Sequence, residues 1–146
     1  MKTRLLPGLT LIEVLIVIGI VAALASIGIF VSMNLYHGYT LVSQRDQLVT
    51  LMQKARSQSL YNTNQASHGI YIAPTQFILF QGGSYLTRTP SYDEVVERDP
   101  VIVVSGHSEA VFEQLNAKLP TPVSITLAQD SRSMSIIINE EGAIIF

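Results

Sequence analysis

The fold of this chain is decided by the stretch Pro7-Gly8-Leu9-Thr10-Leu11-Ile12-Glu13, which leads into an otherwise uncharged apolar run from Val14 to Val31. A carboxylate inside an apolar segment of membrane length costs about 2.5–3.5 kcal/mol at the centre of the bilayer, so such residues are usually paired or functional. Glu13 is therefore the first candidate functional residue.

The stretch from Thr10 to about Ser59 contains no proline and predicts one continuous helix. Its first half is apolar on all sides, and its character changes near Tyr39 to an amphipathic pattern. One face of the second half carries Leu41, Leu48, Leu51, Met52, Ala55 and Ser59. We expect this face to cover a sheet.

After Asn62-Thr63-Asn64 the sequence changes to short apolar runs separated by turn residues, which is typical of an antiparallel sheet. We predict strands at Gly69–Ala73, Phe77–Gln81, Tyr85–Thr87, Val101–Val104, Val123–Leu127, Ser135–Ile138 and Ala143–Phe146. Gly82-Gly83 and Asn139–Gly142 are expected to form hairpin turns, and the polar segment Arg88–Pro100 a mobile loop. The predicted fold class is α+β, with a long N-terminal helix packed on an antiparallel sheet domain.

Length and charge limit the possible functions. The 146 residues leave room for a single small globular domain beside the apolar segment. The formal net charge is −2, and loss of the first eight residues would remove Lys2 and Arg4 and leave 7 basic against 11 acidic residues. A nucleic acid is therefore not an expected ligand, because phosphate binding needs a basic surface. The absence of cysteine excludes disulfides, thiolate metal sites and a cysteine nucleophile.

The distribution of charge also predicts an orientation. Lys2 and Arg4 precede the apolar run, and the first charge that follows it is Arg45. By the positive-inside tendency, we expect a single membrane span, with the N-terminus in the cytoplasm and the C-terminal domain outside.

The motif from Gly8 to Glu13, preceded by a short basic stretch and followed by an apolar helix, resembles the class III signal of type IV pilins and pseudopilins. In that family a prepilin peptidase cleaves after the glycine and methylates the new N-terminus. The resemblance implies cleavage between Gly8 and Leu9, N-methylation of Leu9, and a role for Glu13 in filament assembly.

The rest of the chain resembles the H-type minor pseudopilins of type II secretion in pattern. The similarity lies in His68–Ile72 followed by Phe77–Phe80, in Leu119-Pro120 before a strand, and in Gly142 between two terminal strands. The absence of cysteine points the same way, because many major pilins close a C-terminal loop with a disulfide. The implied function is a structural subunit of a type II secretion pseudopilus or a type IV pilus, with prepilin peptidase and other pilin or pseudopilin subunits as partners.

This interpretation divides the chain into four parts. Residues 1–8 are the leader peptide, 9–35 the transmembrane half of the helix, 36–62 its amphipathic half, and 63–146 the β-rich globular domain.

Three alternatives remain open. The first is an ordinary signal peptide cut after Ala25, which fits a small-x-small pattern at Ala23-Leu24-Ala25; against it, Glu13 would lie inside the apolar region, and the apolar run continues past the cut. The second is an uncleaved anchor with an incidental Glu13. The third is a minor pilin of a DNA-uptake or adhesion pilus with a ligand-binding domain, for which a basic or exposed aromatic patch would be expected.

No arrangement of residues predicts catalysis. The sequence has no Walker loop and no G-x-S-x-G motif, and His37, His68 and His107 lack metal-ligand spacing. We expect these histidines to be ordinary surface or loop residues. We also expect no enzymatic activity, no cofactor and no metal.

Two further groups of residues invite a functional interpretation. Asp93, Glu94, Glu97 and Asp99 suggest calcium, but they lack regular calcium-loop spacing, so we expect a solvated loop. Phe77, Phe80, Tyr85 and Phe112 are expected in the core, because aromatic residues of strands usually lie there.

Overall fold

The structure is a computed structural model that describes residues 10–146, apart from the side chains of residues 27–38. Helix α1 spans Leu11–Leu60, a length of 50 residues. The chain divides into two compact units, Met1–His37 and Gly38–Phe146. The predicted leader 1–8 and the cleavage site between Gly8 and Leu9 lie outside the described residues.

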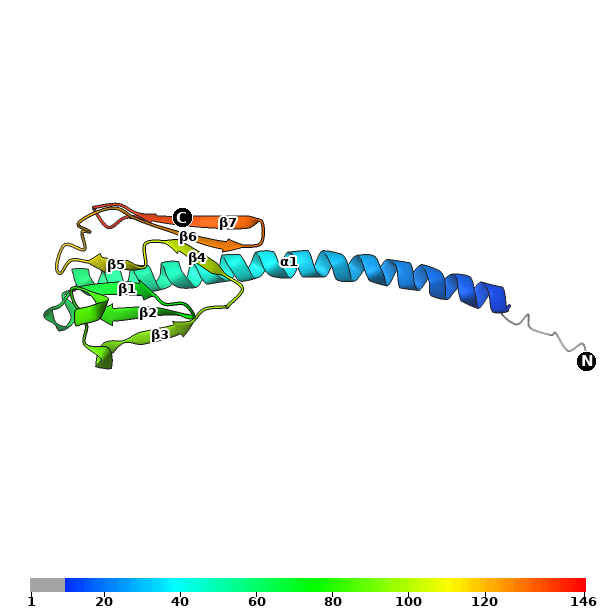
Figure 1. Ribbon diagram of the computed structural model, residues 1–146, viewed down its shortest axis with the longest axis horizontal. Coiled ribbons are helices and arrows are strands. Elements are labelled where there is room, and N and C mark those ends of the chain that lie inside the picture. The colour runs from blue at the N-terminus through cyan, green and yellow to red at the C-terminus, as the bar shows by residue number, and fades with distance from the viewer. Residues whose placement is uncertain (1–9) are drawn as a thin grey trace, which may run out of the picture. The chain divides into compact units, whose positions relative to one another are not determined.

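The second unit contains two four-stranded antiparallel sheets, ordered β3-β2-β1-β5 and β4-β6-β7-β8 (Figure 1). The strands are β1 His68–Ile72, β2 Gln76–Gln81, β3 Glu94–Glu97, β4 Val103–Gly106, β5 Glu109–Phe112, β6 Val123–Gln129, β7 Arg132–Ile138 and β8 Ile144–Ile145. Three short 3₁₀ turns accompany them: η1 Thr63–Gln65, η2 Tyr85–Thr87 and η3 Pro90–Tyr92. The predicted α+β class with antiparallel sheets is confirmed.

One hydrophobic core joins α1, from Leu41 onward, to both sheets. Leu48, Met52 and Ala55 of α1 are fully buried, together with Phe77 of the first sheet and Ile136 of the second. All six residues of the predicted apolar face are buried. Strand side chains form the other side of this core, because every second side chain of a strand faces the same way.

Ser59 fixes the end of α1 to the first sheet. Its buried hydroxyl donates a hydrogen bond to the carbonyl of Phe112 over 3.0 Å and accepts one from the amide of His68 over 2.9 Å. The helix ends one residue later, and Asn62 adopts the left-handed conformation with φ 54°. Asparagine tolerates this conformation, which commonly terminates helices.

The prediction of a strand at Tyr85–Thr87 is wrong, because this segment is the 3₁₀ turn η2. It lies on the side of β2 that faces away from α1. The Tyr85 ring stacks on Tyr71 with centroids 3.8 Å apart and meets Phe80 edge-on at 5.8 Å. Of the four aromatic residues expected in the core, Phe77, Phe80 and Phe112 are buried, whereas Tyr85 is half-buried and packs on Phe80. Gly82-Gly83 accordingly leads into η2 and is not a hairpin turn.

The segment Arg88–Pro100 is not an irregular loop as predicted. It contains η3 and the strand β3, which pairs with β2 in the register Phe77↔Val96 and Ile78↔Val95. Pairing on one side is sufficient to order this acidic segment as the edge of the first sheet.

In the second sheet, β6 and β7 form a tight hairpin in which Gln129 pairs with Arg132. The predicted turn at Asn139–Gly142 is confirmed, since it joins β7 to β8. The strand predicted at Val101–Val104 lies two residues further on, as β4. Strand β5 was not predicted.

Candidate functional site

The first turn of α1 holds the candidate residue Glu13 in a capping arrangement. The Glu13 amide donates a hydrogen bond to Oγ1 of Thr10 over 3.3 Å, and the Thr10 amide donates one to Oε2 of Glu13 over 3.5 Å. This is the reciprocal pattern of a capping box, in which two amides that have no partner within the helix are satisfied. The carboxylate also lies at the positive end of the helix dipole, where an acidic side chain stabilises the first turn.

This role for Thr10 was missed in the sequence, although the signal is present. Thr10 and Glu13 stand three residues apart before an apolar run, which is the capping-box spacing. Glu13 therefore has a structural role in the single chain beside any role in assembly.

The side chains of residues 14–25, which follow Glu13 in α1, are apolar and exposed. Between Leu11 and Leu24 the large apolar side chains are 43–82% exposed, and Glu13 is the only charged residue from Leu11 to Ser26. A helix that is apolar on all sides is typical of one that packs inside a larger assembly or a membrane.

Within the described part of the chain, no helix combines the length and the hydropathy that crossing a membrane requires. The predicted span 9–35 includes Leu9 and the side chains of 27–35, which lie outside the described residues. The span thus stays a prediction.

The two histidines whose side chains the structure describes lie apart in the fold, His68 in β1 of the first sheet and His107 beside Ser124 of β6 in the second. His68 is buried in β1, so its prediction as a surface or loop residue is wrong, and its Nδ1 has no hydrogen-bond partner. Burial lowers the pKa of the His68 imidazole below its usual 6.5, against a weaker opposing effect of the Ala66 backbone. His107 is exposed beside Ser124, and the side chain of His37 lies outside the described residues.

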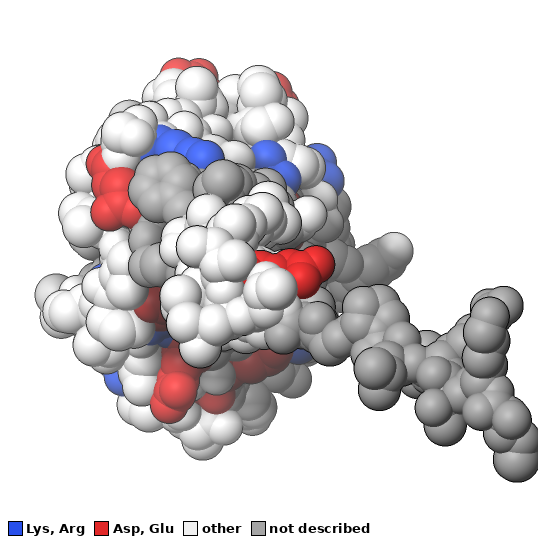
Figure 2. All heavy atoms as spheres, turned by 90° about the vertical axis from the view of Figure 1, so that its right-hand side faces the viewer, with Lys and Arg blue, Asp and Glu red and all other residues white. Residues whose placement is uncertain are grey.

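The four acidic residues between 93 and 99 are spread along β3 and its flanks. Asp93 pairs with Arg88 at 2.7 Å, Glu94 pairs with Lys54 of α1 at 2.5 Å, and Asp99 accepts a hydrogen bond from the Val101 amide. In the described residues, no group of three or more His, Asp or Glu side chains is placed to hold a metal ion. Figure 2 shows acidic side chains in several separate places, at the top of the view as well as lower down.

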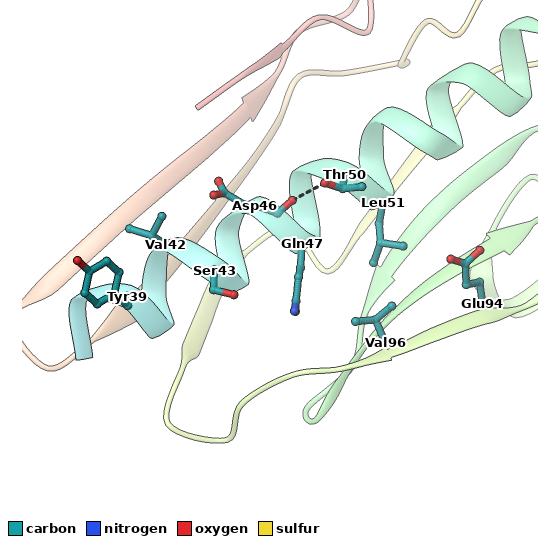
Figure 3. Close-up of a pocket in the computed structure, with 9 residues that line it drawn as sticks. All are labelled: Tyr39, Val42, Ser43, Asp46, Gln47, Thr50, Leu51, Glu94 and Val96. Carbon is teal, nitrogen blue, oxygen red and sulfur yellow. Dashed lines mark hydrogen bonds between the residues drawn. The ribbon is translucent and has the colours of Figure 1, made fainter. Parts of the chain in front are cut away.

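A groove of about 680 Å³ runs between α1 and β3 within the second unit. The helix contributes Tyr39, Val42, Ser43, Asp46, Gln47, Thr50 and Leu51, and β3 contributes Glu94 and Val96. Figure 3 shows Gln47 and Leu51 pointing from the helix toward the strand. Both carboxylates that line the groove are ion-paired, Asp46 with Arg45 at 2.7 Å and Glu94 with Lys54 at 2.5 Å.

A comparison with known proteins finds no matching protein family, no similar curated protein and no matching solved structure.

Proposed function

We propose that this chain is a minor pilin or pseudopilin, a structural subunit of a type II secretion pseudopilus or a type IV pilus. Prepilin peptidase cleaves it between Gly8 and Leu9 and methylates Leu9. The apolar half of its helix anchors it in the inner membrane, with the C-terminal domain outside, until it is assembled into a filament with other subunits. No catalytic role is proposed.

The observation that carries this proposal is the placement of Glu13. It is the only charge on the described apolar, exposed part of α1, and it lies in the first turn next to the motif that resembles a prepilin cleavage site. The same helix supplies, from Leu41 onward, one side of the domain core.

Assembly depends on ion pairing in the filament interior. After cleavage, Leu9 carries a charged amine, and Glu13 of one subunit reaches the amine of a neighbour, so that each charge offsets the desolvation of the other. Leaving one such charge buried without its partner costs about 3–5 kcal/mol. In the single subunit, before assembly, the Glu13 carboxylate instead accepts a hydrogen bond from the Thr10 amide.

The test must separate this pairing from helix capping. Glu13→Gln removes the charge but keeps a side chain that serves equally well at this position of a capping box. Thr10→Ala removes the capping hydroxyl but keeps the charge. We expect Glu13→Gln to be cleaved normally and to be lost from sheared filaments, whereas Thr10→Ala is both cleaved and incorporated.

Processing would be read by intact mass, and incorporation by cross-linking to neighbouring subunits. Equal loss of incorporation in both variants would assign Glu13 to capping alone. Wild-type incorporation of Glu13→Gln would refute the pairing mechanism.

A further inference from the structure

We propose that a pocket between the end of α1 and the turn from β7 to β8 binds a carboxylate through the guanidinium of Arg56. The ligand is a monocarboxylate with an apolar group beside it, supplied by a small organic acid or by the C-terminal residue of a polypeptide. This inference goes beyond the proposed function and does not rest on it, because every residue of the pocket belongs to the folded unit Gly38–Phe146.

The pocket has a volume of about 570 Å³, which is within the usual range for sites that take small ligands. One wall is a face of α1 and the residue after it, because positions three and four apart in a helix lie side by side. This wall consists of Gln53, Arg56, Ser57, Leu60 and Tyr61, and the opposite wall of Gly142, Ala143 and Ile144.

Arg56 is a half-buried cation without a partner. Its Nε is fully buried and has no hydrogen bond, and no described side chain forms an ion pair with its guanidinium. By contrast, Lys54 pairs with Glu94 at 2.5 Å, and Lys118 pairs with Glu141 at 2.8 Å. Arginine stays charged at any ordinary pH, and leaving a partly buried charge unpaired is costly. An anion in the pocket would remove this cost.

The packing of Arg56 determines which of its atoms meet a ligand. A Cβ built on Gly142 would lie 3.4 Å from Nε of Arg56, so this atom packs against the turn. The two Nη atoms are left as the end of the guanidinium that reaches the pocket. Two such nitrogens donate a parallel pair of hydrogen bonds to the two oxygens of a carboxylate, which gives both affinity and a defined orientation.

Charge favours a carboxylate over a phosphate. Arg56 is the only charged side chain among the residues that line the pocket, and it balances a single negative charge. Glu140 and Glu141 directly precede Gly142 and would repel a second one.

The rim of the pocket suits an apolar group next to the carboxylate. Leu60 is 40% exposed and Tyr61 is 83% exposed, and both line the pocket with Ile144. A tyrosine and an arginine close together are typical of the residues that contribute most to binding. The hydroxyl of Ser57 and the amide of Gln53 lie on the same wall and offer further hydrogen bonds.

Binding would be measured by nuclear magnetic resonance on the full chain in a non-ionic detergent, from the shifts of the Gly142 and Ala143 amides. The probe is N-acetyl-leucine, and the matched neutral control is N-acetyl-leucinamide. A charge-assisted pair of hydrogen bonds should make the acid bind about tenfold more tightly than the amide. Equal binding of both, or binding of neither, would overturn the proposal and leave water as the only partner of Arg56.

A third ligand distinguishes the two sources of the carboxylate. The peptide Gly-Ser-Gly-Leu with a free C-terminus presents the same group on a chain. Tighter binding of the peptide than of N-acetyl-leucine would assign the pocket to a polypeptide C-terminus, and any other order would assign it to a small acid.

Two variants of α1 test the role of Arg56. Arg56→Gln should abolish the preference for the acid, because the charge is lost. Lys54→Gln removes one positive charge from the same helix outside the pocket and should keep the preference at about tenfold. A preference that survives in Arg56→Gln, or that is lost equally in both variants, would refute the site.

Arg56→Lys tests the geometry and retains the charge if Arg56→Gln fails to fold. It should reduce the preference for the acid about two- to fivefold, because an ammonium group cannot donate the parallel pair of hydrogen bonds. An unchanged preference would show that the carboxylate is attracted by charge alone and is not held by the guanidinium.

Discussion

The two halves of α1 are both rich in apolar side chains, yet these side chains differ in burial. In the half that belongs to the domain, Leu48 and Met52 are fully buried. In the half that begins at Leu11, Leu15 is 58% and Ile18 is 59% exposed. The domain core thus includes α1 side chains from Leu41 onward, while the described large apolar side chains from Leu11 to Leu24 are exposed.

The largest expected effect comes from truncating a buried residue of the domain half. Leu48→Ala should lower the free energy of unfolding by about 3 kcal/mol, because it leaves a cavity in the core that α1 forms with the strands. The matched change in the exposed half, Leu15→Ala, should change it by less than about 0.5 kcal/mol. Urea unfolding of the full chain in detergent, followed by circular dichroism, measures both. Equal effects would show that the exposed half also contributes to the domain fold.

A substitution in the turn between β7 and β8 should destabilise the domain nearly as much. Gly142 has φ 73°, and a Cβ there would lie 2.1 Å from the carbonyl oxygen of Ala117. Gly142→Ala should therefore destabilise the domain by about 2 kcal/mol. Gly83→Ala serves as its control, since a Cβ at Gly83 meets no atom within 4 Å. Comparable melting temperatures for the two variants would contradict the turn geometry.

A smaller effect on the stability of the domain is expected from pH. Burial lowers the folded-state pKa of His68, so the unfolded chain binds the proton more readily. The domain should accordingly keep its full stability above pH 6.5, the ordinary pKa of histidine. It should lose stability as the pH falls from 6.5 toward the lower pKa that His68 has in the folded state. His68→Gln should reduce this loss, while a change at the exposed His107 should leave it intact. The melting temperatures of wild type and His68→Gln would be measured across this pH range. If both depended on pH in the same way, His68 would not be the source of the loss of stability.

Much of the domain could be predicted from sequence, because its signals are local. The face of α1 from Leu41 to Ser59 follows from helical spacing, and the strands β1, β2, β6 and β7 follow from apolar runs. The turn at Gly142 was recognisable because its glycine stands between two such runs.

The errors arose where tertiary contacts decide the structure. Tyr85 looks like a strand residue, but its ring stacks on Tyr71 and its amide donates to Oε1 of Glu109 over 2.7 Å, which holds η2 over the sheet. Strand β3 has only Val95 and Val96 between glutamates, so its pairing with β2 could not be recognised from apolar pattern.

The candidate site was predictable only in part. Glu13 could be predicted as a site residue because a charge in an apolar run is costly. Its capping partner Thr10 was missed, although the three-residue spacing of the two is that of a capping box. The burial of His68 could not be foreseen, because it depends on β1 lying between β2 and β5. The groove beside β3 likewise depends on a strand that the sequence did not reveal.

The most direct test of the proposed function is the intact mass of the chain purified from membranes of cells that contain a prepilin peptidase, with N-terminal sequencing. A processed pilin or pseudopilin would begin at Leu9 with a methylated amine, and a matched strain without the peptidase would retain Met1. A mature start at Ser26 would indicate an ordinary signal peptide, and an intact Met1 in both strains an uncleaved anchor. Either result would contradict the assignment of this chain as a pilin-type filament subunit.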